Sequence, residues 1–305
     1  MPALGTRVRR AAFLSVSILI TSVFFAGGTA SATGATPVGL GSATNFAILG
    51  GAGLSNTGAG TRVTGDVGLS PVSGTGYTGP DMTCTQFVPP SQVFKTDAGG
   101  PVDPTCFVPN AGTQVTTPRA DELTAFTHTS NLPGATPLAA DLTTAGSLVA
   151  GLYSYPAAAT NLSGTLTLNA QGDPNSTWIF QASSSLITSP GSSVTFSNLP
   201  PGVTAAQLAC NVYWTVQSSV TLDTTTNFVG TILALQDISL NNGVTVTGRL
   251  LAGSNAGGSG AVTLINDTIV RPAGCTVSPA GTGGTPASPT AGPPTAVPGT
   301  PRFTG

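Results

Sequence analysis

Short apolar runs recur along this chain, 18 residues apart in the clearest pair, with small polar and turn-forming residues between them. The triplet "VTL" (220–222) returns as "ISL" (238–240), and "FVGTILA" (228–234) returns as "VTGRLLA" (246–252). Alternating β-branched and polar residues, bounded by Gly, Asn, Asp and Ser, predict short strands. Related stretches occur at 63–70, 166–168, 194–196 and 262–264.

This repeat length predicts a mainly β fold. A period near 18 is too short for a propeller blade and lacks the spacing of leucine-rich repeats. It suits a β-solenoid, in which each repeat forms one coil and the stacked coils bury a continuous core. Val, Ile, Leu and Phe would then point inward, while Thr, Ser, Asn, Gly and Ala point outward.

Two segments interrupt the strand pattern. Residues 72–116 contain many turn residues and two cysteines, which indicates a loop-rich cap inserted into the repeat. Residues 117–129 ("TPRADELTAFTHT") predict one helix, with Thr117 as its N-cap and Pro118 in its first turn. The residues expected to pack this helix against the strands are Ala120, Leu123 and Phe126.

Both ends of the chain differ from this central domain, which we place at residues 33–275. Residues 1–32 combine a basic start, an apolar run and "ASA" (30–32), as in a signal peptide. An N-terminal membrane anchor is the alternative, but no second apolar stretch approaches the length of a membrane span. Residues 276–305 are rich in Pro, Thr, Gly and Ala without apolar periodicity, and predict a disordered tail. We therefore expect a secreted, extracellular protein.

The composition limits the chemistry that this protein could perform. Charged residues make up 7% of the chain, and it has a single Lys (Lys95), a single His (His128) and a single Glu (Glu122). The net charge of −2 provides no basic surface for nucleic acid and no polybasic patch for a membrane. We expect no nucleic-acid partner, no stable membrane insertion after signal cleavage, and a monomer.

Four cysteines fit an exported protein, because disulfides persist in oxidising compartments. They allow three pairings, of which we favour Cys84–Cys106 and Cys210–Cys275. A zinc site is the competing interpretation, but the sequence has no CxxC motif and its one histidine lies in another segment. The prediction is two disulfides and no metal or other cofactor.

An enzyme is the first alternative, since some parallel β-helices carry clustered acidic residues. Asp66 and Arg249 occupy the same position in related repeats, which suggests a charge pair. The other solenoid candidates, Asp223, Asp237 and Asp267, fall beside turns, where Asp is a normal turn former. No serine of the repeats has a nearby histidine, which argues against a Ser-His-Asp arrangement. We therefore predict no catalytic residues.

Several motifs appear in one order and together resemble the secreted microbial ice-binding protein family. They are "LGSATNFAILGGAGLSNTG" (40–58), "VTGDVGLSP" (63–71), "GLYSYPAAATNLSGTLTLNAQGDPNSTWIFQ" (151–181), "CNVYWTV" (210–216), "GTILA", "GRLLA" and "GAVTLINDTI" (260–269). The resemblance covers about residues 38–275. It implies a discontinuous right-handed β-solenoid of triangular cross-section with an α-helix along one face. It also implies a non-catalytic protein that adsorbs to ice or ordered water.

The resemblance also suggests which residues contact ice. In the family, the ice-binding face follows a short segment with a small residue at its second position and often Thr or Asn at its fourth. Carried over by position, the predicted face consists of Gly68, Ser70, Gln181, Ser183, Thr215, Gln217, Ala234, Gln236, Ala252 and Ser254. This chain has Ser or Gln where the family often has Thr.

A second alternative is a cell-surface or matrix adhesin that uses the same scaffold for another extracellular partner, because fold does not fix function. Trp178, Tyr213 and Trp214 could stack on sugar rings. In "WIF" and "VYW", however, the aromatic residues alternate with or adjoin apolar residues, which favours core packing.

Overall fold

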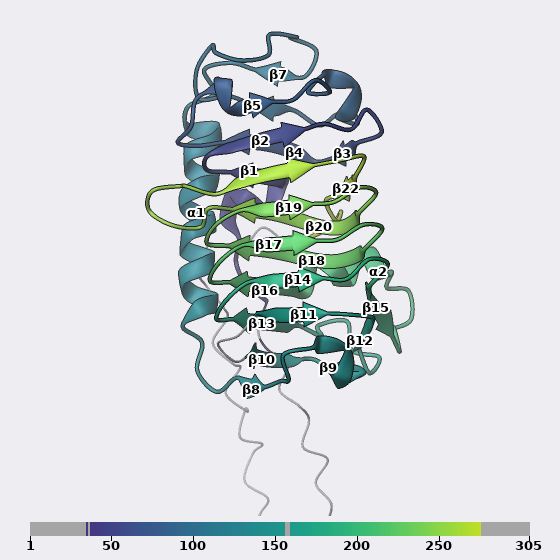
Figure 1. The fold of residues 1–305 in the computed structure, drawn as a ribbon. Coiled ribbons are helices and arrows are strands. Elements are labelled where there is room, and N and C mark those ends of the chain that lie inside the picture. The colour runs from purple at the N-terminus through teal and green to yellow at the C-terminus, as the bar shows by residue number, and fades with distance from the viewer. Residues whose placement is uncertain (1–34, 36, 156–158, 276–305) are drawn as a thin grey trace, which may run out of the picture. The chain divides into compact units, whose positions relative to one another are not determined.

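The computed structural model describes residues 35, 37–155 and 159–275 of the chain. The predicted signal peptide and tail lie outside these residues, so both remain predictions. The described residues form parallel strands that stack in three rows, each of which makes one face of the molecule (Figure 1). No helix among them is long and apolar enough to cross a membrane.

The first row, called here the helix-covered face, is a ten-strand path of parallel pairs. Its strands in spatial order are β7 (Phe107–Val108), β6 (Val93–Phe94), β4 (Asp66–Leu69), β1 (Phe46–Gly50), β20 (Thr245–Ala252), β18 (Asn227–Ala234), β16 (Val212–Val216), β13 (Trp178–Ala182), β10 (Gly151–Tyr155) and β8 (Thr136–Pro137).

The second row, called here the open face, is a separate sheet of seven short parallel strands. In spatial order these are β11 (Thr160–Leu162), β14 (Leu186–Thr188), β17 (Val220–Leu222), β19 (Ile238–Leu240), β21 (Ala261–Leu264), β2 (Gly53–Asn56) and β5 (Tyr77–Thr78). Figure 1 looks onto this face.

The third face is built partly from the same long strands as the first. Its strands are β9 (Ser147–Val149), β12 (Thr165–Asn169), β15 (Ser193–Ser197), the first halves of β18 and β20, β22 (Thr268–Val270) and β3 (Arg62–Thr64). Two eight-residue strands, β18 and β20, therefore serve two faces. Each has a glycine at the middle, Gly230 and Gly248, and Gly230 has a φ of +113°. That backbone conformation favours glycine and allows the strand to turn the corner.

The 18-residue spacing read from the sequence is the spacing of one part of the fold. Val220 pairs with Ile238 across β17 and β19, and Phe228 pairs with Val246 across β18 and β20. Other coils are longer, since Ile238 pairs with Val262 and Trp178 with Val212. This stacking occurs because each coil leaves an apolar inner side that only the next coil can cover.

The order of the coils in space differs from their order in sequence. β1 pairs with β20, β2 with β21 and β3 with β22, so the first coil of the domain lies against the last. Helix α1 (Thr113–Ser130) then runs along the stack and leads the chain to the opposite end (Figure 1). From β8 onward the chain builds the remaining coils back toward the first.

The cap (residues 72–116) contains more regular structure than the loop-rich insertion that the sequence predicted. β5 extends the open face, while β6 and β7 extend the helix-covered face. Two short 3-10 turns, η2 (Gly74–Gly76) and η3 (Cys84–Gln86), connect these strands. Phe107 makes edge-on contacts with Tyr77 and Phe87, at centroid distances of 6.0 and 6.1 Å, which gives the cap a small core of its own.

The predicted helix exists, but it begins earlier than its sequence signals indicated. Gly112 is the N-cap, and Thr117 and Pro118 lie inside the helix. The prediction of the N-cap was therefore wrong, because tertiary packing overrode a local capping signal. The predicted packing side was also wrong in part, since Ala120 is exposed and Leu123 half-buried. The side that packs is Val115, Pro118, Glu122, Ala125, Phe126 and Thr129.

The remaining helical segments are short. They comprise η1 (Gly41–Asn45), η4 (Leu142–Ala145), α2 (Ala205–Leu208) and η5 (Ala209–Asn211). The helix α2 was not predicted, and its Thr204–Gln207 capping box was the sequence signal for it.

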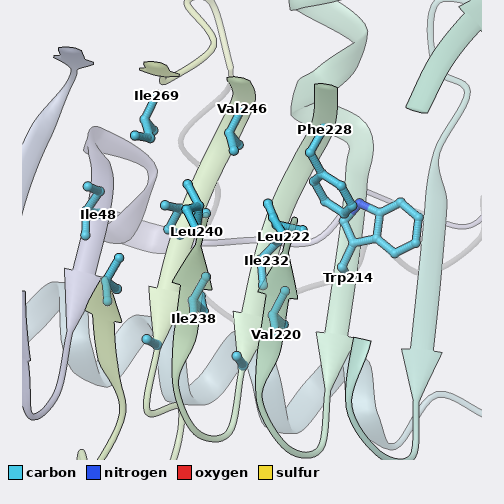
Figure 2. Packing of buried hydrophobic residues seen from close by; sticks show 14 of the residues in the cluster. Ile48, Trp214, Val220, Leu222, Phe228, Ile232, Ile238, Leu240, Val246 and Ile269 are labelled. Atoms are coloured by element: carbon cyan, nitrogen blue, oxygen red, sulfur yellow. The ribbon is translucent and has the colours of Figure 1, made fainter. Parts of the chain in front are cut away.

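Apolar residues from all three faces fill the interior (Figure 2). The Trp214 ring stacks on Phe180 at a centroid distance of 4.0 Å and contacts Phe228 at 5.0 Å. Trp178, Tyr213 and Trp214 are each at most 4% exposed. The interpretation of these aromatic residues as core is thus confirmed, and none of them can stack on a surface sugar.

Both favoured disulfides are present, Cys84–Cys106 within the cap and Cys210–Cys275 between η5 and the end of the described domain. They close loops with sequence separations of 22 and 65 residues. Fixing such a segment lowers the entropy of the unfolded chain and so stabilises the fold.

Candidate functional site

The residues predicted to contact ice lie on or beside the helix-covered face. Six of the ten are buried, namely Gly68, Ser70, Thr215, Ala234, Ala252 and Ser254. The helix α1 contacts β13, β16 and β18 on this side. A buried side chain cannot meet an ice surface, so the prediction was wrong for these six residues.

Three of the polar residues in this set hold α1 in place instead. Gln181 Nε2 donates to the backbone carbonyls of Thr129 and Leu132, at 2.7 and 3.0 Å. Thr215 Oγ1 donates to Thr129 Oγ1 at 2.7 Å, and Ser254 Oγ donates to the Glu122 carboxylate at 2.6 Å. These polar groups satisfy one another under the helix.

The last three predicted residues, Ser183, Gln217 and Gln236, lie in the turns that lead from the helix-covered face to the open face. Ser183 and Gln236 are exposed and Gln217 is half-buried. Gln236 Oε1 accepts hydrogen bonds from Ser218 and Ser219, both at 3.3 Å. These three residues therefore lie at the edge of the open face and are not part of its strands.

The open face carries a single column of outward side chains, one from the middle of each strand. In the central strands each belongs to a triplet whose two apolar neighbours are buried, as in Val220-Thr221-Leu222. In spatial order the column consists of Asn161, Ile187, Thr221, Ser239, Thr263, Ser55 and Thr78. Five of these seven side chains are Thr or Ser.

Parallel pairing places the members of this column in strict register. Thr221 is paired with Ser239, Ser239 with Thr263, and Thr263 with Ser55. Neighbouring strands lie about 4.8 Å apart, so seven strands form a column about 29 Å long. The period-two alternation of strands sends every member of the column to the same side.

The open face has little charge. Its seven strands contain no Lys, Arg, His, Asp or Glu. Carboxylates lie at its borders, where they hold turns. Asp223 Oδ1 accepts from Asn241 Nδ2 at 2.8 Å, and Asp237 Oδ1 accepts from the Ala261 N–H at 2.8 Å. Asp141, which is bridged to Asn161 at the end of the face, accepts the Thr143 N–H at 3.0 Å. The hydrogen bond from Asn241 lowers the pKa of Asp223, so this carboxylate stays ionised at neutral pH.

The third face also has outward threonines, but it is interrupted. Strands β15 and β18 pair through only one residue pair, Ser193 and Asn227. The chain between them forms α2 and η5, and η5 contacts β18 and β20. The exposed Arg62 adds a positive charge at the end of this face. The open face is therefore the longer continuous and uncharged surface.

The acidic residues considered for catalysis have structural partners. Asp267 accepts the backbone N–H groups of Val244 and Ile265, at 2.8 and 2.6 Å, and burial raises its pKa to about 6. Asp66 accepts the Gln92 N–H at 3.1 Å and forms no ion pair with Arg249, so the expected charge pair is wrong. Within the described residues no group of His, Cys, Asp and Glu is arranged to hold a metal ion.

The ice-binding-like family model matches residues 48–270, a span that includes all seven strands of the open face. The chain belongs to this ice-binding-like family. Curated relatives support the assignment. An ice-binding protein of Nostoc sp. (strain HG1) is 34% identical over 242 residues, which cover 79% of this chain and 78% of that protein. An ice-binding protein of Flammulina populicola is 31% identical over 273 residues, covering 86% of this chain and 99% of the relative.

Solved structures of this ice-binding-like family share the fold. The crystal structure of an ice binding protein from an Antarctic biological consortium matches with a TM-score of 0.59 and 31% sequence identity. The match covers 78% of this chain and 92% of that one. The family resemblance inferred from sequence motifs is thus confirmed.

Proposed function

We propose that this member of the ice-binding-like family binds ice through its open face. The three rows of parallel strands support a discontinuous right-handed β-solenoid of triangular cross-section, in which the open face is one flat side. The observation that carries the proposal is the continuous column of in-register hydroxyl-bearing side chains from Thr221 to Ser55. Relatives that carry the name ice-binding protein over most of their length add to it.

The chemistry of the column suits ordered water. Hydroxyls of Thr and Ser donate and accept hydrogen bonds, and the methyl group of Thr restricts where neighbouring waters can lie. A repeat of about 4.8 Å along the stack presents these groups at regular intervals, so one water layer can bridge many of them. Charged side chains would orient water around themselves, and the strands of this face have none.

A rigid face reduces the cost of adsorption. Binding loses affinity when side chains or loops must be ordered at the interface. Here the backbone of the column is fixed by parallel pairing on both sides of Thr221, Ser239 and Thr263, and the apolar neighbours of each are buried. Threonine also has few accessible rotamers because it is β-branched. Many weak water-mediated contacts can then add up.

We further propose that the protein works outside the cell as a monomer, without a catalytic step or a cofactor. The sequence features of residues 1–32 and the two disulfides support an exported protein. An ice surface needs no nucleophile, metal or shifted pKa in the binding site.

The test changes the open face without touching the core. Thr221→Tyr and Thr263→Tyr each place a large ring in the column, and each should strongly reduce partitioning of the purified protein into a growing ice hemisphere. The double variant should be excluded from ice. The matched controls are Thr195→Tyr and Thr268→Tyr, the same change at exposed positions of the third face.

Folding of every variant is checked by circular dichroism and thermal unfolding. The proposal holds if the wild type and both third-face variants enter ice while the open-face variants do not. Exclusion of the folded wild-type protein would refute ice binding itself, and a glycan-binding screen would follow. Loss of partitioning only in the third-face variants would assign the site to that face instead.

A further inference from the structure

Arg249 is a fully buried cation, and the groups to which it donates hydrogen bonds are uncharged. It lies in β20, paired with Thr231 of β18, and its side chain is 0% exposed. Its Nε and Nη2 donate to the Thr44 carbonyl at 3.1 and 2.9 Å, and its Nη1 donates to Thr231 Oγ1 at 3.3 Å. Among the described residues the single ion pair is Arg119–Glu122, so no carboxylate there neutralises Arg249.

The positive charge of Arg249 is therefore not neutralised, and some of its N–H groups have no acceptor among the described residues. A guanidinium has five N–H donors, and three are accounted for, so two have no acceptor in the described protein. A buried charge needs a counter-charge and satisfied hydrogen bonds, because its transfer from water is costly. Burial lowers the pKa of Arg249 to about 10, a value at which the group remains charged at neutral pH.

A second cation lies near enough to increase this cost. Arg271 acts on Arg249 by charge repulsion, which also lowers the pKa of Arg249. The Nε atom of Arg271 is buried and has no hydrogen-bond partner in the described structure. The charge of Arg271 also acts on Asp66, against the rise that burial gives the pKa of that carboxyl. Of the two, Arg249 is therefore the guanidinium that the described residues leave without a counter-charge.

A small cavity lies against the Arg249 side chain. It has a volume of about 30 Å³ and is bordered by the segment 37–44, by η5 and by the Cys210–Cys275 disulfide. Asn211 and Tyr213 also line it. Because the Tyr213 hydroxyl donates to the Val38 carbonyl at 3.1 Å, it can accept but has no proton left for the cavity. The remaining side-chain donors of the lining residues are the Arg249 guanidinium, the Asn211 amide and the Thr44 hydroxyl.

We propose that this cavity binds a chloride ion, which serves as the counter-ion of Arg249. The volume has room for a particle the size of a water molecule or a halide, and a monatomic anion fits it better than the larger phosphate or sulfate ions. The free N–H groups of Arg249 suit an acceptor that needs no proton in return. A water molecule would fill the space but would leave the charge uncompensated. The proposal does not depend on ice binding.

The first experiment measures thermal unfolding of the full chain in sodium chloride, with sodium gluconate added to keep the ionic strength constant. Gluconate is too large for the cavity. A ligand that binds only the native state stabilises it in proportion to the logarithm of its concentration. We expect Tm to rise on the order of 3–5 °C per tenfold increase in chloride above its Kd.

A variant pair links this effect to the site. Arg249→Met should abolish the dependence of Tm on chloride, whereas Arg62→Met, at an exposed arginine of β3, should leave it unchanged. A crystal grown in sodium bromide provides a readout that is independent of folding energetics. It should show an anomalous bromine peak in contact with Arg249 Nη1 or Nη2, even if Arg249→Met fails to fold.

The outcomes separate the two possible occupants. A chloride-dependent Tm together with a bromine peak at Arg249 establishes the site. Equal Tm values in chloride and gluconate, with a cavity peak that lacks anomalous signal, would show a water molecule and overturn the proposal. A chloride dependence that persists in folded Arg249→Met would also overturn it, because the anion would then act elsewhere.

Discussion

Glu122 provides the sharpest prediction about stability. This carboxyl lies on the packed side of α1 and is 0% exposed. Its Oε2 contacts Arg119 Nη1 at 2.5 Å, and its Oε1 accepts the Ser254 hydroxyl at 2.6 Å. Burial raises the pKa of Glu122 from 4.5 to about 7, against the lowering effects of Arg119 and Ser254. The change to test is Glu122→Gln, which keeps the shape and removes the titration.

The sign follows from proton binding. Between pH 4.5 and pH 7 the folded carboxyl holds a proton that the unfolded one has lost, so stability falls as pH rises. The contribution is fully present below pH 4.5 and is lost as pH passes through about 7. One pKa unit corresponds to about 1.4 kcal/mol, and the whole shift therefore corresponds to about 3 kcal/mol.

The assay is urea unfolding of the wild type and Glu122→Gln between pH 4 and pH 8. Asp267, whose pKa burial raises to about 6, contributes a slope of the same sign to both proteins, and it cancels in the difference. We expect the stability of the variant relative to the wild type to increase by about 3 kcal/mol from pH 4 to pH 8. A difference that is constant over this range would refute the reasoning, because Glu122 would then be ionised and paired with Arg119 throughout.

Two further predictions concern the scaffold. Gly248→Ala should destabilise the fold by roughly 3 kcal/mol or more in urea unfolding, because its Cβ would lie 1.8 Å from the Gly230 carbonyl oxygen. The control is Gly257→Ala, whose Cβ would meet nothing nearer than 3.4 Å and which should be close to neutral. Replacing Cys84 and Cys106 by Ser should lower the free energy of unfolding by about 3 kcal/mol and speed hydrogen exchange in the cap, while partitioning into ice persists. Unchanged exchange would show that the small aromatic core is enough to hold the cap together.

The sequence determined the repeat unit and its interior. Apolar residues at the flanks of the triplets are buried, as for Val220 and Leu222, apart from the half-buried Phe196, because a strand sends alternate side chains to the same side. The spacing of 18 residues predicted the pairing of β17 with β19 and of β18 with β20. Of the three possible cysteine pairings, the sequence favoured the one that the structure has.

Only the tertiary structure decided which face is covered. Outward positions of a strand look alike in sequence, and small residues suit both a flat surface and the close approach of a helix. Gly68 is small because α1 packs over its side of the stack: a Cβ there would lie 2.9 Å from the Phe46 ring and 3.0 Å from Val115 of the helix. Ala234 and Ala252, by contrast, face the interior of the solenoid. The contact between Ser254 and Glu122 joins residues 132 positions apart, a separation that no local pattern encodes.

The same limit applies to the charged residues. Arg249 replaces Thr231 of the preceding coil, and in sequence both fall at an outward position next to a corner glycine. The segment that contains Thr44 covers this position, so a residue typical of protein surfaces is buried with a backbone carbonyl as its main acceptor. Sequence periodicity fixes the direction in which a side chain leaves its strand. Whether that side chain meets water, a helix or an ion depends on segments that fold over it from elsewhere in the chain.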